Sequence, residues 1–95
     1  MNYIEKAYKI LCTKINVEHE LTMLYVLLVL TKKRHATLED VHDAWSVWRN
    51  IDMPSHKSVI PFNSLTLEIQ EKDMKYVKAI NETYQELQSN VECEL

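Results

Sequence analysis

No glycine occurs anywhere in this chain of 95 residues, whereas glycine makes up about 7% of an average protein. Glycine supplies backbone conformations with positive φ and lets the backbone approach a ligand closely. The chain therefore lacks the glycine-rich phosphate loop, the dinucleotide-binding turn and the nucleophile elbow. The enzyme classes that depend on those three loops are excluded.

Length and charge favour a single domain that binds neither nucleic acid nor a membrane. Eleven Lys and Arg residues stand against 14 Asp and Glu residues, for a net charge of −3, whereas surfaces that bind a duplex are usually basic. The longest apolar run, Leu21 to Leu30, has ten residues, about half of what a membrane span needs. The N-terminal segment is charged throughout and has no signal-peptide pattern. We expect one domain over residues 1–95, in the cytoplasm.

Apolar residues at helical spacing predict an all-α fold, a compact domain of four helices. In the first helix these residues are Ile4, Ala7, Tyr8, Leu11 and Ile15. The second helix, around residues 24–30, is apolar on all sides, so we expect the other helices to cover it. Because only three helices are available for that, a homodimer or higher homo-oligomer is also expected.

The third helix has a clear start. Thr37 followed by Asp40 is typical of a capping box, and the helix is expected to end near Asn50. Its apolar stripe consists of Leu38, Val41, Trp45 and Trp48, with His42 and Arg49 at the margin.

An irregular loop with two prolines separates the third helix from the fourth. It covers residues 51–64, and residues 58–61 could form a short extended segment because proline favours extended backbone before it. Thr66 is the expected N-cap of a long fourth helix. Residues 89–95 are expected to fray.

Asp73 breaks the apolar stripe of the fourth helix. It lies four residues after Ile69 and four before Val77, so it should face the core, where a carboxylate without partners is costly. One interpretation is a structural tie to the proline loop. The other is that Asp73 forms the floor of a cleft, where it orients Arg49 or contacts a ligand.

A basic cluster, residues 32–35 (Lys-Lys-Arg-His), follows the second helix. Cations complement the dipole at the C-terminal end of a helix, which is the simpler explanation. A contact with a phosphate is the alternative.

The segment His56-Lys57-Ser58-Val59-Ile60-Pro61-Phe62-Asn63-Ser64-Leu65, followed by Glu71-Lys72-Asp73, resembles the signature of ryanodine-receptor-type repeat domains. Trp45 or Trp48 supplies the upstream tryptophan of that signature, and Lys57 stands where the repeats usually have proline. Together with the segment Glu39-Asp40-Val41-His42-Asp43-Ala44-Trp45, the arrangement also resembles a family of short uncharacterised bacteriophage proteins, over residues 3–81.

These resemblances imply a small helical module that binds a ligand related to adenine nucleotides. In a phage, such a protein could sequester an immune second messenger of the host without any catalysis. The messenger would be a cyclic dinucleotide or an ADP-ribose derivative such as cyclic ADP-ribose, and its capture would block host anti-phage signalling.

The residues offer groups suited to such a ligand. Aromatic rings for stacking a purine are Trp45, Trp48, Phe62 and Tyr76. Arg49 and Lys57 could bind phosphate. His42, His56 and Asp73 could bind sugar hydroxyls or the edge of the base. Alternatively, the tryptophans only pack in the core and the two cations are solvated.

Other functions remain open. A helical protein-interaction module that inhibits a host enzyme is the main alternative, and exposed Met23, Met53 and Met74 would favour it.

Helix-turn-helix binding to DNA is disfavoured by the acidic start of the third helix. Catalysis has little support, because the four histidines lack metal-ligand spacing and Cys12 has no evident activating partner. We expect no cofactor, no metal and no catalytic residue.

Overall fold

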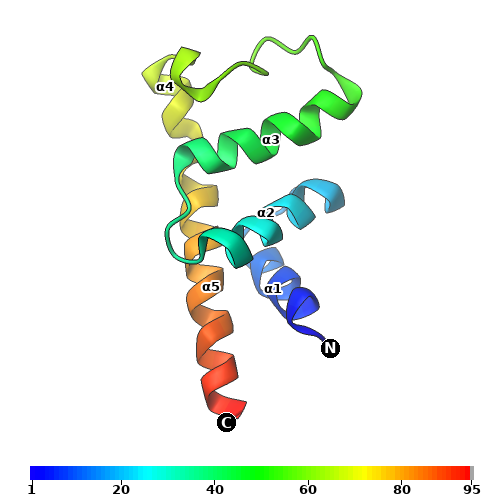
Figure 1. Cartoon of the computed structure of the whole chain (residues 1–95), viewed down its shortest axis with the longest axis vertical. Helices are drawn as coiled ribbons and strands as arrows, with labels where there is room; N and C mark the ends of the chain where they lie inside the picture. The colour runs from blue at the N-terminus through cyan, green and yellow to red at the C-terminus, as the bar shows by residue number, and fades with distance from the viewer. Residues whose placement is uncertain (95) are drawn as a thin grey trace.

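Five α-helices and two short 3₁₀ helices follow one another in this computed structural model, which describes the backbone of residues 1–94 and the side chains of residues 1–89 (Figure 1). Within these residues there is no strand. The long helix α5 (Met74–Glu94) forms one side of the molecule. Helices α1, α2 and α3 stack against it in chain order, and the proline loop lies beyond α3 (Figure 1). The prediction of an all-α, four-helix domain is confirmed.

Helix α1 (Tyr3–Cys12) begins at Asn2, whose side-chain oxygen accepts a hydrogen bond from the backbone N–H of Glu5. Its predicted stripe faces the core, with Ala7 and Leu11 fully buried. Just beyond the helix, the ammonium group of Lys14 lies 2.6 Å from the carboxylate of Glu86 on α5. This ion pair joins the end of α1 to α5.

Helix α2 (His19–Lys32) contacts α1, α3 and α5, as expected for the central helix. Tyr25, Val26 and Val29 are buried by these neighbours. The expectation that the helix is covered on all sides is wrong, however, because Leu27 is 54% exposed and Met23 is 40% exposed. Three neighbouring helices cannot surround a fourth completely, so one apolar side of α2 faces outward.

Helix α3 (Leu38–Asp52) has the predicted capping box. The N–H of Asp40 donates to the Thr37 hydroxyl, and the N–H of Thr37 donates to the Asp40 carboxylate. The helix ends two residues later than Asn50. His42, expected at the margin, is buried because it bonds to the loop that covers this part of α3.

The loop after α3 is made of turns. The N–H of Val59 donates to the carbonyl of His56, which closes a turn where the extended segment at residues 58–61 was expected. Residue 58 belongs to this turn, and the described part of the loop contains no strand. A 3₁₀ helix, Phe62–Ser64, completes the loop.

The predicted fourth helix is interrupted near its start. Thr66 caps a single turn, α4 (Leu67–Gln70), and a 3₁₀ helix, Glu71–Asp73, leads into α5. The side-chain amide of Gln70 donates to the carbonyls of Phe62 and Leu65, so α4 is fastened to the loop. The C-terminal residues expected to fray are helical as far as Glu94, and Leu95 lies outside the described residues.

Asn81 on α5 holds the connection between α2 and α3. Its side-chain oxygen accepts from the N–H of Ala36 at 3.0 Å, and its side-chain nitrogen donates to the Ala36 carbonyl at 3.3 Å. Ala36 is only 6% exposed, so both of its backbone groups need these partners. One side chain therefore fixes this connection against α5.

Candidate functional site

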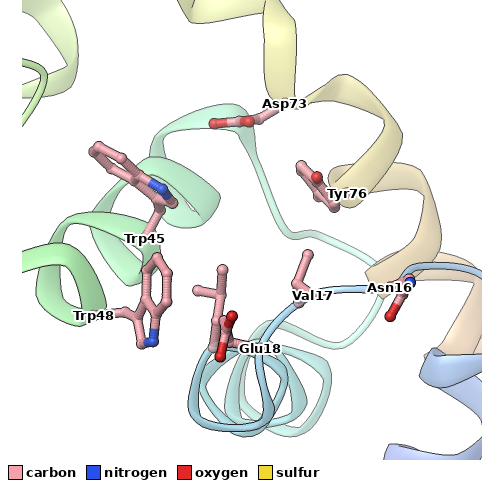
Figure 2. Close-up of a pocket in the computed structure, with 8 residues that line it drawn as sticks. Asn16, Val17, Glu18, Trp45, Trp48, Asp73 and Tyr76 are labelled. Carbon is pink, nitrogen blue, oxygen red and sulfur yellow. The ribbon is translucent and has the colours of Figure 1, made fainter.

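A hollow of about 610 Å³ lies between α3, the start of α5 and the connection from α1 to α2. We call it the tryptophan cleft. Figure 2 shows Trp45 and Trp48 of α3 facing Asp73 and Tyr76 across it, with the connecting segment along the remaining side. Four predicted site residues therefore line one hollow.

The two indole rings are held by neighbours on α3 and in the loop. The Trp45 ring stacks on His42, with centroids 5.9 Å apart, and meets His56 edge-on at 5.3 Å. The guanidinium carbon of Arg49 lies 4.3 Å from the centroid of the Trp48 ring. Both indoles are half-buried against the core, and both still border the cleft. The same two indoles therefore pack against the core and line the cleft.

Asp73 lines the cleft from the 3₁₀ helix that precedes α5. Burial raises the pKa of its carboxyl, and the positive charges of His42, Lys75 and Lys72 act in the opposite direction. Among the described residues its carboxylate makes no hydrogen bond, so it does not form the expected tie to the proline loop. The carboxylate instead borders open space (Figure 2).

A second hollow, of about 250 Å³, adjoins the cleft on the other side of Trp45 and Asp73. We call it the lysine hollow, because Lys57 of the loop and Lys72 line it together with His42. Lys57 was a predicted site residue. Lys72 was not, although it belongs to the Lys-Asp pair on which the resemblance partly rests.

Arg49 does not join Lys57 at a common cationic rim, and that part of the prediction is wrong. It lines a separate hollow of about 440 Å³ together with Glu18, Glu20 and Asp52. Arg49 follows Trp48 directly, and a helix turns by about 100° per residue, so the two side chains leave α3 in different directions. The Nε of Arg49 is buried without a hydrogen-bond partner in the part of the chain that the structure describes. Among the described residues, no hydrogen bond or ion pair joins Arg49 to Asp73, although the sequence suggested that Asp73 orients Arg49.

The remaining predicted residues support the loop. The Nε2 atom of His42 lies 2.7 Å from the carbonyl oxygen of Ile60, and its ring is 6.1 Å from that of Phe62. His56 accepts a hydrogen bond on Nδ1 from the N–H of Ser58. Phe62 and His56 line neither the tryptophan cleft nor the lysine hollow. His42 does line the lysine hollow.

The sequence interpretation missed the connection between α1 and α2. Asn16, Val17 and Glu18 complete the cleft, and Glu18 adds a second carboxylate. No periodic pattern marks this short segment, so only the tertiary arrangement could have indicated it. Tyr25 lies beneath the site, with its ring 5.7 Å from that of Tyr76. Burial and the charge of Asp73 raise the pKa of Tyr25.

Two further features bear on function. The described residues contain no group of three or more His, Cys, Asp or Glu side chains that could hold a metal ion. As far as the chain is described, none of its helices combines the length and the apolar character needed to span a membrane.

Residues 2–85 match the sequence profile of a domain family described as a domain of unknown function, DUF7701. The match covers most of the chain, so the chain belongs to this family. No curated protein and no solved structure matches it.

Proposed function

We propose that this member of the DUF7701 family is a non-catalytic binder of a small molecule derived from an adenine nucleotide. The supporting observation is the junction at Trp45 and Asp73, where a cleft lined by aromatic rings meets a hollow lined by lysines. A nucleotide has the same division into a flat ring and a charged phosphate part.

The base would lie in the tryptophan cleft. Trp45, Trp48 and Tyr76 offer ring faces or edges there, and stacking a base on an aromatic side chain is worth about 1–3 kcal/mol in nucleic-acid complexes. Asp73 would accept hydrogen bonds from sugar hydroxyls, because its carboxylate has no partner among the described residues.

The phosphates would lie in the lysine hollow. Lys57 and Lys72 outnumber the single carboxylate of Asp73 there. The hollow beside Arg49 is the less suitable place, since Glu18, Glu20 and Asp52 surround that one cation and would repel a phosphate.

The biological role that we propose is sequestration of an immune second messenger in a phage-infected host cell. A cyclic dinucleotide or an ADP-ribose derivative such as cyclic ADP-ribose has the required chemistry. A binder in the host cytoplasm lowers the free messenger by mass action, so it needs neither a catalytic group nor a cofactor.

Isothermal titration against cyclic ADP-ribose isomers, cyclic dinucleotides and AMP tests the proposal. We expect saturable binding of at least one member, weakened by Trp45→Leu and by Lys57→Gln. Val47→Ala, on the exposed side of α3, should leave the affinity unchanged. Absence of heat with every member of the panel would refute it.

A second candidate is a protein-interaction module that inhibits a host enzyme. The exposed side chains of Met23, Met53 and Met74 favour it, because methionine adapts to varied partner surfaces. A pull-down from host lysate that returns one stoichiometric partner, together with no binding in the titrations, would favour this function. The outward side of α2 is also where we propose that a homodimer forms, which light scattering of the purified protein can test.

A further inference from the structure

A fourth hollow lies at the opposite end of α2 from the tryptophan cleft. It measures about 390 Å³ and is lined by Lys33, Arg34, His35, Tyr84, Gln85 and Gln88. We call it the basic hollow. No carboxylate lines it among the described side chains, although the chain as a whole carries a net charge of −3.

The dipole of α2 favours cations at this helix end, but it provides no counter-ion for them. Lys32, the last residue of the helix, already lies 3.5 Å from the carboxylate of Asp40. Lys33, Arg34 and His35 lie beyond the helix end, and none of them forms an ion pair in the part of the chain that the structure describes. The charges of Lys33 and Arg34 are therefore available to a ligand.

The backbone holds Lys33 in a conformation that lysine disfavours. Lys33 has φ 60° and ψ −122°, and the N–H of His35 donates to the carbonyl of Lys32 at 2.9 Å. These are the features of a type II′ turn with Lys33 at its first central position, where glycine predominates. A strained residue of this kind persists when the surrounding structure fixes it, and such residues cluster at ligand sites.

The other wall of the basic hollow is built from uncharged hydrogen-bonding groups of α5. The side-chain amide of Gln88 donates to the Tyr84 hydroxyl at 2.7 Å. The Tyr84 oxygen is the acceptor in this bond, so its own O–H can donate to another group. The two hydrogen bonds between Asn81 and Ala36 fix the turn against α5 and keep the two walls together.

We propose that the basic hollow is a second binding site, and that its ligand is a small molecule bearing a phosphate or pyrophosphate group. The planar guanidinium of Arg34 suits two phosphate oxygens at once, whereas Lys33 supplies a compact charge. The Tyr84 O–H adds a neutral donor. This inference stands independently of the tryptophan cleft and of the function proposed for it.

The test is a titration of the full chain with inorganic pyrophosphate at low ionic strength, followed by amide NMR. We expect saturable shifts at residues 33–35 and at Tyr84, with smaller shifts around Trp45. Arg34→Gln should weaken the affinity at least tenfold. Lys9→Gln, which removes an exposed cation from α1, is the matched control and should leave the affinity unchanged.

Lys33→Gly separates binding from folding. Because glycine tolerates this backbone conformation, the variant should melt at a higher temperature than the wild type while binding pyrophosphate several-fold more weakly. Three results would each overturn the proposal: no saturable shift at residues 33–35, equal losses in Arg34→Gln and Lys9→Gln, or unchanged affinity in Lys33→Gly. If residues 33–35 respond to pyrophosphate as expected, a panel of free nucleotides identifies which phosphate-bearing molecule binds best.

Discussion

Trp45 and Asp73 border the same two hollows, one from α3 and the other from the 3₁₀ helix that leads into α5. In the part of the chain that the structure describes, no hydrogen bond joins the two side chains. A ligand that occupies both hollows must pass between them. Substitutions at this pair should therefore affect binding of the whole ligand.

Replacing Asp73 by Asn should change how stability depends on pH. Burial raises the pKa of the Asp73 carboxyl in the folded state, so the folded state binds this proton more tightly than the unfolded state. Its contribution to the free energy of unfolding is thus largest at acidic pH and is lost as the pH rises through the folded pKa. Asp73→Asn should flatten this dependence and raise the melting temperature at neutral pH, which circular dichroism can measure.

Asp43→Asn is the control for that experiment, because Asp43 is an exposed carboxylate on α3 that lines neither the tryptophan cleft nor the lysine hollow. It should leave the pH dependence as in the wild type. A lower melting temperature of Asp73→Asn at neutral pH would mean that the carboxylate has a stabilising partner, which contradicts an unpaired Asp73.

Replacing Trp45 by Leu should weaken ligand binding more than it weakens the fold. Loss of one stacked ring corresponds to about 1–3 kcal/mol, which is roughly a 5-fold to 150-fold loss of affinity. The ligand is the tightest binder found in the nucleotide panel, and the measurement is isothermal titration. Phe62→Leu is the control, because this ring lines neither hollow. It should change the affinity by less than about twofold, whereas a loss of ~1.4 kcal/mol would change it tenfold.

Replacing Asn81 by Leu should destabilise the protein. The substitution leaves the buried N–H and C=O of Ala36 without partners, and an unsatisfied buried polar group costs about 1–3 kcal/mol. Urea denaturation should show a loss of this size. Gln85→Ala, one turn further along α5 and exposed, should cost less than about 0.5 kcal/mol, as is usual for surface changes.

Replacing His42 by Leu should loosen the proline loop. The His42 ring holds the carbonyl of Ile60 through Nε2, and leucine cannot donate that bond. Trypsin should then cleave after Lys57 faster than in the wild type, which mass spectrometry of timed digests can follow. His42→Gln, which retains a donor, should give an intermediate rate, and equal rates for all three proteins would contradict the role assigned to this bond.

Local patterns in the sequence were sufficient to predict most of the helices. The stripe of α1 and the capping box at Thr37 and Asp40 depend on residues three or four apart, so one helix determines them. Trp45 and Trp48 are three residues apart, as are Asp73 and Tyr76. Residues at this spacing lie on the same side of a helix. This is why four cleft residues could be named in advance.

Other features depend on contacts between distant segments. The 3₁₀ interruption before α5 accompanies the bonds of Gln70 to loop carbonyls, which no helical pattern reveals. Glu18 lines the cleft because of the way in which α1 and α2 pack. Arg49 was misplaced because its neighbour in sequence, Trp48, faces the cleft while Arg49 itself lies beside three carboxylates.

Because α5 follows α1, α2 and α3 in the chain and contacts each of them, the order of synthesis matters for this protein. While the ribosome is making the first three helices, Ala7, Leu11 and Val29 have no Ile80 to pack against. The core can close only after the buried residues of α5, Val77 to Leu87, have left the exit tunnel. Closure of this core should therefore wait for α5, and nascent chains stalled before Met74 should expose their apolar stripes.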